Sequence, residues 1–428
     1  MFISIVMPVH NDREYVGAAL KSVLVQCHDE CEIIIVDDGS VDGSGEILKS
    51  WCRRSKKIKV LSGHDLGPSK ARNMALDVLS PQSELTFFID ADDIISKRYF
   101  SRFISFFTNN DVNLASAKIR YFGDYRANHG LNYRFKKGSR VVNILTDYQD
   151  VQFNLGGIAV RSSILRGDGF RFNEAISFWE DALFINRIIL NDENYGLVAG
   201  PTYYYRKHQH KASLVEHSWS QKERYIDVPK FGYQHLIGYS KQKFHHVIKY
   251  VQYLVLYHMK LIMVNGKGRR AFSKMSKSEY NDFIATYTSI IAEIDGELID
   301  EQHKTVEVNY MLHQWQSRGW PVTAVQPTIP YARGSLVRKS GLHFEIKLKV
   351  VGVDVDEVTG RLNGFQQSTR KIDIKPVKIF NTSIRDWGEA TIYLNFFELM
   401  SLRTITIVDS SGEMSIAPVK QFFSERGK

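Results

Sequence analysis

The first half of the chain contains short runs dominated by apolar residues, and each run ends at polar or acidic residues. The runs occupy residues 2–9, 32–36, 58–61 and 85–89. Such runs are typical of strands buried on both faces of a parallel sheet. Apolar residues recur at helical spacing from Val16 to Leu24, between the first two runs. Strand, helix and strand in this order predict right-handed βαβ units and an α/β domain.

The second half of the chain shows two other periods. From residue 216 to about 320 apolar positions follow a helical period, most clearly over 246–262. After Gly334 apolar and polar residues alternate, with turn residues between the alternating stretches, which predicts a small antiparallel β-sandwich. We therefore expect an α/β domain over 1–215, a helical linker over 216–330 and a β-sandwich over 335–428.

Carboxylates follow two of the predicted strands at the point where each strand ends. Asp37 and Asp38 follow the second run, and Asp90, Asp92 and Asp93 follow the fourth. In open α/β sheets ligands bind outside the carboxyl ends of the strands. Carboxylate oxygens there suit Mg²⁺ or Mn²⁺, which share their coordination sphere with substrate phosphates. A solvated acidic turn and a helix cap are the alternative interpretations, and the acidic cluster alone does not decide between them.

Two further segments favour a binding site over a turn. Gly67-Pro68-Ser69 predicts a helix start with Arg72 in its first turns, a good position for an anion. Glu180 and Asp181 open another predicted helix, where the helix dipole stabilises acidic side chains. Together, the strand ends suit a nucleoside diphosphate, with carboxylates for the base or ribose, Arg72 for phosphate and a metal that bridges the phosphates.

Composition and charge narrow the class of protein. The 428 residues are 43% hydrophobic and 24% charged, as in ordinary globular proteins. No apolar run reaches the roughly 18 residues of a transmembrane helix, and the apolar start lacks the features of a signal peptide. Cys27 and Cys31 have no second pair of ligands, so we expect reduced cytoplasmic thiols instead of a zinc site. The net charge of +9 favours an anionic partner.

The motifs occur together in a known order. Residues 5–11, 36–40, 67–73 and 88–93 resemble family 2 glycosyltransferases, and the resemblance extends over roughly residues 1–215. It implies a Rossmann-like GT-A fold, a UDP-sugar donor and Mn²⁺ or Mg²⁺ at the Asp90-Ala91-Asp92 (D-x-D) motif. It also assigns Asp181 as the general base beside Glu180, because the acceptor hydroxyl must lose its proton during attack.

The same resemblance suggests positions for the other ligands. The donor-binding residues that it implies are Pro8, Val9, Asn11, Asp38, Arg72, Asp90, Ala91, Arg206 and Ser213. The metal ligands that it implies are Asp92 and His208. Two departures affect the base contacts: His10 stands where the family often has Tyr, and Met74-Ala75 replaces a frequent x-Gly.

Other segments leave alternatives open. Residues 112–145 are poorly periodic and rich in Tyr, Arg and Lys, so they suit either a solvated loop or a contact with an anionic acceptor. Residues 154–160 resemble the family segment that lines the acceptor and donor-sugar pocket. The β-sandwich contains no catalytic constellation, and we expect it to mediate homo-oligomerisation or acceptor docking.

The sequence therefore predicts an inverting hexosyl- or N-acetylhexosaminyltransferase that uses a UDP-sugar and a metal. Its expected acceptor is an anionic or polysaccharide envelope polymer, such as teichoic acid or capsule, and its expected location is the cytoplasm, including the inner face of the membrane. A non-catalytic nucleotide- or polysaccharide-binding scaffold is the alternative. Nucleic acid is not an expected partner, because acidic residues at the strand ends would repel its phosphates.

Overall fold

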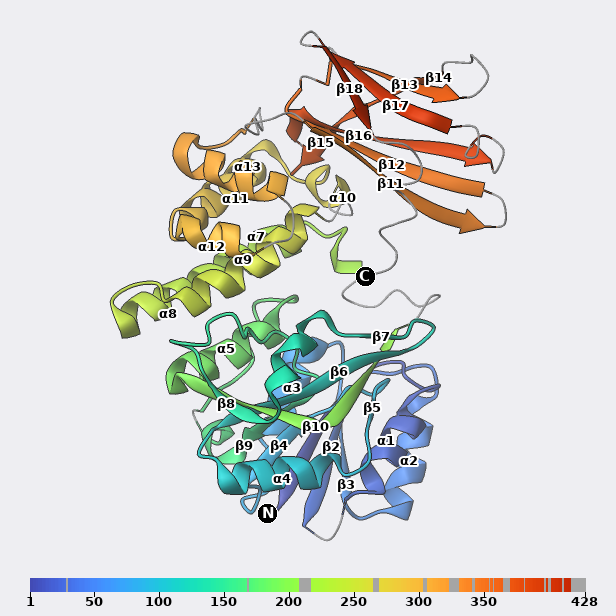
Figure 1. Cartoon of the computed structure of the whole chain (residues 1–428). Coiled ribbons are helices and arrows are strands. Elements are labelled where there is room, and N and C mark those ends of the chain that lie inside the picture. Colours follow the sequence, from blue (N-terminus) through green and yellow to red (C-terminus); the bar gives the residue numbers. More distant parts are fainter. Residues whose placement is uncertain are drawn as a thin grey trace. The chain divides into compact units, whose positions relative to one another are not determined.

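The computed structural model divides the chain into two compact units, Met1–Val255 and Leu256–Lys428 (Figure 1). It describes residues 1–27, 30–167, 169–207, 217–264, 269–302, 306–322, 331–340, 343–353, 355–356, 358–364, 370–380, 382–395, 398, 402–409 and 412–416.

The N-terminal unit is a mixed α/β domain. Its strands are β1 (Ile3–Val9), β2 (Cys31–Asp38), β3 (Ile58–Gly63), β4 (Leu85–Phe88), β5 (Ile94–Ile95), β6 (Leu114–Gly123), β7 (Ala127–Asn128), β8 (Arg140–Asn143), β9 (Ile158–Arg161) and β10 (Asn194–Lys207). Its helices are α1 (Val16–Leu24), α2 (Ser44–Arg54), α3 (Gly67–Leu76), α4 (Tyr99–Asn109), α5 (Glu180–Asp192), α7 (Glu223–Asp227) and α8 (Gln234–Phe244). Shorter helical turns are η1 (Gly130–Lys137), η2 (Ser162–Leu165) and η3 (Val228–Tyr233), and α9 (Lys249–Val264) spans the division between the units.

The ten strands form one sheet in the order β3-β2-β1-β4-β9-β6-β10-β5, with β7 paired to β6 and β8 to β10. Strands β1 to β4 are parallel, and Val9 lies opposite Asp37 where β1 and β2 end. Strand β9 runs antiparallel to β4, and β6 and β10 return to the direction of β4. The carboxyl ends of six strands therefore meet at one edge, which confirms the predicted α/β fold.

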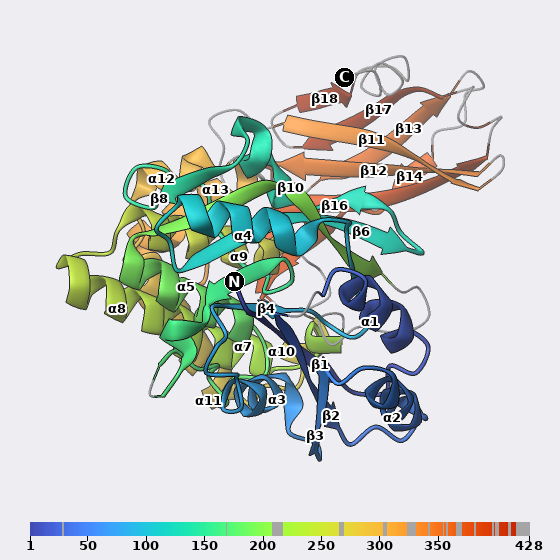
Figure 2. The same ribbon diagram turned by 90° about the horizontal axis from the view of Figure 1, so that it is seen from below.

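Helices cover both faces of the sheet. Figure 2 shows α1 and α2 on one side of β1, β2 and β3, and α3 on the other. The face toward α1 and α4 holds a large core in which Ile5 and Phe87 are fully buried. On the opposite face, the ring of Phe88 lies 5.8 Å from Phe184 of α5. Because successive side chains of a strand point to opposite faces of the sheet, both faces carry apolar side chains against which helices pack.

The N-terminal unit differs from its sequence prediction at three points. Strand β6 occupies the middle of the sheet, within the 112–145 segment for which the sequence indicated no strand. The unit continues beyond residue 215 to Val255, because the ring of Tyr233 packs 5.1 Å from Trp179 and Tyr250 Oη donates to Asn186 Oδ1 at 2.7 Å. Cys27 and Cys31 form a disulfide, with Cα atoms 5.7 Å apart, where the sequence predicted reduced thiols.

The C-terminal unit combines helices with two antiparallel sheets, as predicted. Its further helices are α10 (Arg269–Phe272), α11 (Lys277–Ile291), α12 (Gly296–Glu301) and α13 (Val306–Arg318). Its strands are β11 (Tyr331–Ser340), β12 (His343–Val351), β13 (Thr359–Gly364), β14 (Arg370–Ile372), β15 (Lys375–Ile379), β16 (Thr382–Asn395), β17 (Leu402–Asp409) and β18 (Gly412–Ile416). They form the sheets β11-β12-β16-β15 and β14-β13-β17-β18.

One core joins the two C-terminal sheets, since Ile346 and Leu348 of one sheet pack with Ile405 and Ile407 of the other. The helices join this unit through Phe380, whose ring lies 5.0 Å from that of Phe283 in α11. Among the described residues, none of the helices combines the length and the apolar character needed to cross a bilayer.

Candidate active site

The carboxyl edge of the sheet brings together two sequence motifs through one arginine. Arg72, on α3, has a side chain that is only 8% exposed. Its Nη2 lies 3.2 Å from Asp90 Oδ1, and its Nη1 lies 3.1 Å from Glu180 Oε1. Burial opposes the charge on Arg72, but the two carboxylates outweigh it and raise the pKa of the guanidinium. Arg72 is therefore a fixed cation between the D-x-D motif and the acidic pair.

The acidic pair opens helix α5 from a constrained start. Trp179, the residue before the helix, has a φ of 69°, which is rare for a bulky residue. Its ring is held against Tyr233, and this packing fixes where α5 begins. Burial, followed by the charge of Asp181, raises the pKa of Glu180 to about 7 against the opposing effect of Arg72.

Burial also raises the pKa of Asp181. Arg72 and hydrogen bonds from the backbone of Ala182 and Leu155 act in the opposite direction. The Ala182 amide donates to Asp181 Oδ1 at 2.8 Å, so the carboxylate is oriented by its own helix. A partly exposed carboxylate with a raised proton affinity has the properties of a general base.

Asn73 holds the segment before α5 against α3. Its Nδ2 donates to the carbonyl of Phe172 at 3.0 Å, and its Oδ1 accepts from the Phe172 amide at 2.9 Å. Phe172 also stacks on Phe184 with ring centroids 4.0 Å apart. These contacts hold the start of α5 near α3, so Glu180 lies beside Arg72 although the two are far apart in the sequence.

The D-x-D motif forms a closed turn after β4, in which the Asp93 amide donates to the Asp90 carbonyl at 3.1 Å. Asp90 lies toward Arg72, Asp93 is fully buried, and Asp92 is partly exposed. The three carboxylates do not converge, and among the described residues no group of three or more His, Cys, Asp or Glu side chains could hold a metal ion. Asp92 fits a site in which one carboxylate holds a metal that completes its coordination with substrate phosphates.

Hydrogen bonds connect the ends of the first two strands with each other and with the start of α3. Both oxygens of Asp38 accept backbone amides at the start of α3, from Leu66 at 2.7 Å and from Gly67 at 2.8 Å. His10 Nδ1 lies 2.8 Å from the Asp38 carbonyl oxygen. Asn11 Oδ1 accepts the Val41 amide at 2.9 Å. Asp38 thus occupies the anion position at the start of α3, which the sequence assigned to a ligand.

The remaining predicted residues fall into four groups. Pro8 is partly buried beside this network, whereas Val9 and Ala91 belong to the core below the edge. Arg206, at the end of β10, donates from Nε to the carbonyl of Asp92 at 2.7 Å. His208 and Ser213 lie outside the described residues.

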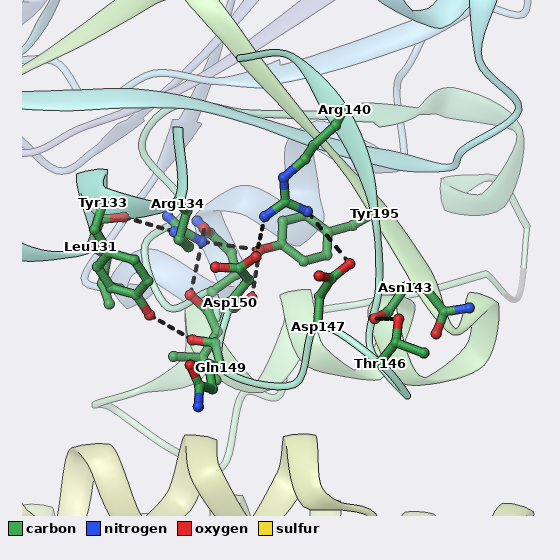
Figure 3. Close-up of polar contacts among 12 residues, drawn as sticks. Leu131, Tyr133, Arg134, Arg140, Asn143, Thr146, Asp147, Gln149, Asp150 and Tyr195 are labelled. Carbon is green, nitrogen blue, oxygen red and sulfur yellow. Dashed lines mark hydrogen bonds and ion pairs between the residues drawn. The ribbon is translucent and has the colours of Figure 1, made fainter. Parts of the chain in front are cut away.

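Several basic and aromatic side chains of the 112–145 segment form an internal polar network, shown in Figure 3. Arg134 is 4% exposed and donates from Nη1 to the Val151 carbonyl at 2.8 Å and to Gln152 Oε1. Arg140 forms ion pairs with Asp147 and Asp150. The Gln152 carbonyl accepts from Asn186 of α5 at 2.9 Å. Arg134 is therefore a structural support for the segment beside α5, and not a surface contact for an acceptor.

No role was predicted for Asn73 or Tyr203, and Asp93 was predicted only as the third carboxylate of the acidic cluster. Asn73 stands within a quoted motif, but its partner Phe172 is 99 positions away. Tyr203 Oη accepts the Asp90 amide at 3.1 Å from within a run of three tyrosines. The one local signal was Asp93, a third carboxylate at the end of a buried strand.

Comparison with known proteins agrees with this geometry. Residues 4–167 match the family described as glycosyl transferase family 2. The minor teichoic acid biosynthesis protein GgaA of Bacillus subtilis is 36% identical over 304 residues, which cover 70% of this chain and 68% of GgaA. The poly(ribitol-phosphate) beta-N-acetylglucosaminyltransferase TarS of Staphylococcus aureus is 26% identical over 226 residues, which cover 50% of this chain but 37% of TarS.

The fold is shared with solved structures. The structure of S. aureus TarS residues 1–349 in complex with UDP-GlcNAc has a TM-score of 0.57 at 18% identity, covering 74% of this chain and 88% of that chain. The longer TarS structure covers 97% of this chain and 77% of that chain, with a TM-score of 0.57 at 14% identity.

Fold and site together define a glycosyltransferase with a GT-A catalytic domain. The chain belongs to glycosyl transferase family 2.

Proposed function

We propose that this glycosyltransferase moves a sugar from a UDP-sugar to a hydroxyl group of an anionic cell-envelope polymer of the teichoic acid type. The printed functions of GgaA and TarS support this acceptor class, and the UDP-GlcNAc complex of TarS supports a UDP-sugar donor. The net charge of +9 is complementary to a polyphosphate acceptor. An N-acetylhexosamine is the first donor sugar to test, followed by glucose and galactose.

The observation that carries the proposal is the placement of Arg72 between Asp90 and Glu180. The D-x-D turn would hold the donor, and Asp181, next to Glu180, would face the acceptor. The acceptor oxygen attacks the anomeric carbon while its proton passes to Asp181. The bond from that carbon to UDP breaks on the opposite side, so the configuration inverts and the UDP oxygen takes the bonding electrons.

Asp92 would hold Mn²⁺ or Mg²⁺, with His208 as the further ligand that the family resemblance implies. When bound, the cation neutralises the negative charge that develops on the departing diphosphate. Arg72 contributes a fixed positive charge at the same edge, in a position buried enough to act strongly. Glu180 keeps the guanidinium oriented toward the D-x-D turn.

The test is UDP release from a panel of UDP-sugars, with and without Mn²⁺ or Mg²⁺, for the wild type and Asp181→Asn. Metal-dependent hydrolysis of one donor that is lost in the variant would support the mechanism. If no donor turns over, calorimetry with UDP follows. Metal-dependent UDP binding would then indicate a missing acceptor, whereas absence of binding would favour the non-catalytic scaffold.

Association into a homo-oligomer through the C-terminal unit, residence in the cytoplasm and a peripheral position at the membrane remain predictions of the sequence. Nucleic acid is not an expected partner.

A further inference from the structure

Three hydrogen bonds attach the D-x-D turn to strand β10. Tyr203 Oη accepts the Asp90 amide at 3.1 Å, the Arg206 amide donates to Asp93 Oδ1 at 2.7 Å, and Arg206 Nε donates to the Asp92 carbonyl at 2.7 Å. Strand β5, which follows the turn directly, pairs with β10 as well. Residues 90, 92 and 93 are thus all held by one strand.

Arg206 is itself held in place by two aromatic rings. Its guanidinium carbon lies 4.7 Å from the ring centroid of Tyr15, just before α1, and 4.3 Å from that of Phe122 in β6. A planar cation stacked on aromatic faces keeps a defined orientation, which a flexible ammonium would not. Arg206 therefore connects the start of α1, the end of β6 and the D-x-D turn.

We propose that Arg206 is a positioning residue for the D-x-D turn, and not a direct ligand of the donor diphosphate as the family resemblance implies. Its Nε and amide fix the backbone around Asp92 and the side chain of Asp93. The direction of the Asp92 carboxylate is thereby set before any ligand binds. This inference rests on the proposed role of the D-x-D turn in holding a metal and UDP.

The first test is hydrogen exchange of the ligand-free protein, in a peptide that covers residues 88–95. Removal of the guanidinium in Arg206→Met should accelerate exchange in this peptide by about tenfold, because one net hydrogen bond and the stacking are lost. Arg206→Lys should accelerate exchange by a smaller factor. Unchanged exchange in both variants would overturn the proposal.

Arg161→Met is the matched control. Arg161 Nε also donates to a backbone carbonyl, that of Val112 at 2.9 Å, and its guanidinium carbon lies 5.3 Å from the ring centroid of Phe107. It should change exchange near its own contacts and leave residues 88–95 as in the wild type. Equal acceleration of the 88–95 peptide in both variants would mean general loosening, which also overturns the proposal.

Calorimetry separates positioning from direct contact. If Arg206 positions the turn, Arg206→Met should weaken UDP binding by about tenfold with Mn²⁺ present and leave the weaker metal-free binding unchanged. If Arg206 contacts the diphosphate, the variant loses metal-free binding too, Arg206→Lys retains most of it, and exchange at 88–95 stays slow. A third outcome is also informative. If Arg206→Met accelerates exchange but the wild type does not bind UDP at all, the proposed function is overturned and the positioning role stands.

Discussion

The guanidinium of Arg72 pairs with the carboxylate of Glu180 at 3.1 Å, although 108 positions separate the two residues. The pair joins α3 to α5, the helix that carries Asp181. A diphosphate that approached Arg72 would meet a cation whose contacts with Asp90 and Glu180 are already made. Glu180 therefore controls the orientation of Arg72 and the charge that a ligand meets.

The raised pKa of Glu180 should make folding stability depend on pH. The pKa rises from 4.5 to about 7, mainly through burial, so between these values the folded protein binds this proton more tightly than the unfolded chain does. The free energy of unfolding should therefore fall as the pH rises through this range, by up to about 3 kcal/mol.

Glu180→Gln cannot titrate and should remove this part of the pH dependence. Urea unfolding of the wild type and the variant at pH 5 and pH 8 measures the difference. Equal loss of stability in both proteins would show that Glu180 is not responsible.

Replacement of Asp181 by Asn should abolish turnover without loss of UDP binding. The amide keeps an oxygen that accepts from the Ala182 backbone, but it cannot take a proton from an acceptor hydroxyl. We expect the turnover number to fall by about a hundredfold to ten-thousandfold. UDP release and calorimetry on the same preparation check both halves of the prediction, and a variant with near-normal turnover would exclude Asp181 as the base.

Asn73→Ala should destabilise the N-terminal unit strongly. It leaves the buried amide and carbonyl of Phe172 without their partner, at a cost of about 2–4 kcal/mol. Asn109→Ala is the control, because Asn109 is exposed and its side-chain amide donates to the carbonyl of Ser105 in its own helix. Urea unfolding should show a change within about 0.5 kcal/mol for the control. Similar losses in the two variants would contradict the proposed link between α3 and α5.

Asp38→Asn should weaken the fold even without a ligand. An amide has one acceptor oxygen, so either Leu66 or Gly67 loses its partner, at a cost of about 1–3 kcal/mol. Asp65→Asn tests the same loop at a side chain that is 76% exposed, and it should have little effect. If Asp38→Asn changed UDP affinity but not unfolding, Asp38 would be a direct ligand contact.

The sequence was sufficient to predict the strands that end at the candidate site. The apolar runs before Asp37 and Asp90 form β2 and β4, and the helix predicted after the Gly67-Pro68 turn is α3, which begins at Gly67 itself. These features depend on local composition, which the chain displays directly. The approach of Arg72 to Asp90 follows from parallel strands whose ends meet at one edge.

Strand β6 could not be predicted in the same way, because polar residues interrupt its apolar pattern. Ser116 is fully buried and donates to Gln152 Oε1 at 3.3 Å, and Lys118 lies over the ring of Phe135 at 6.0 Å. Their partners come from other parts of the fold, so the sequence alone made the segment look like a polar loop. The buried position of Arg134 was hidden for the same reason, since its acceptors include backbone carbonyls and the side chain of Gln152, which no local residue pattern marks.

The clamp between Asn73 and Phe172 has a consequence for protein synthesis. The ribosome completes strands β1 to β4 and α3 long before it adds the segment that pairs with Asn73, 99 positions later. Until then Arg72 lacks its glutamate partner, and the nascent chain presents half of a site.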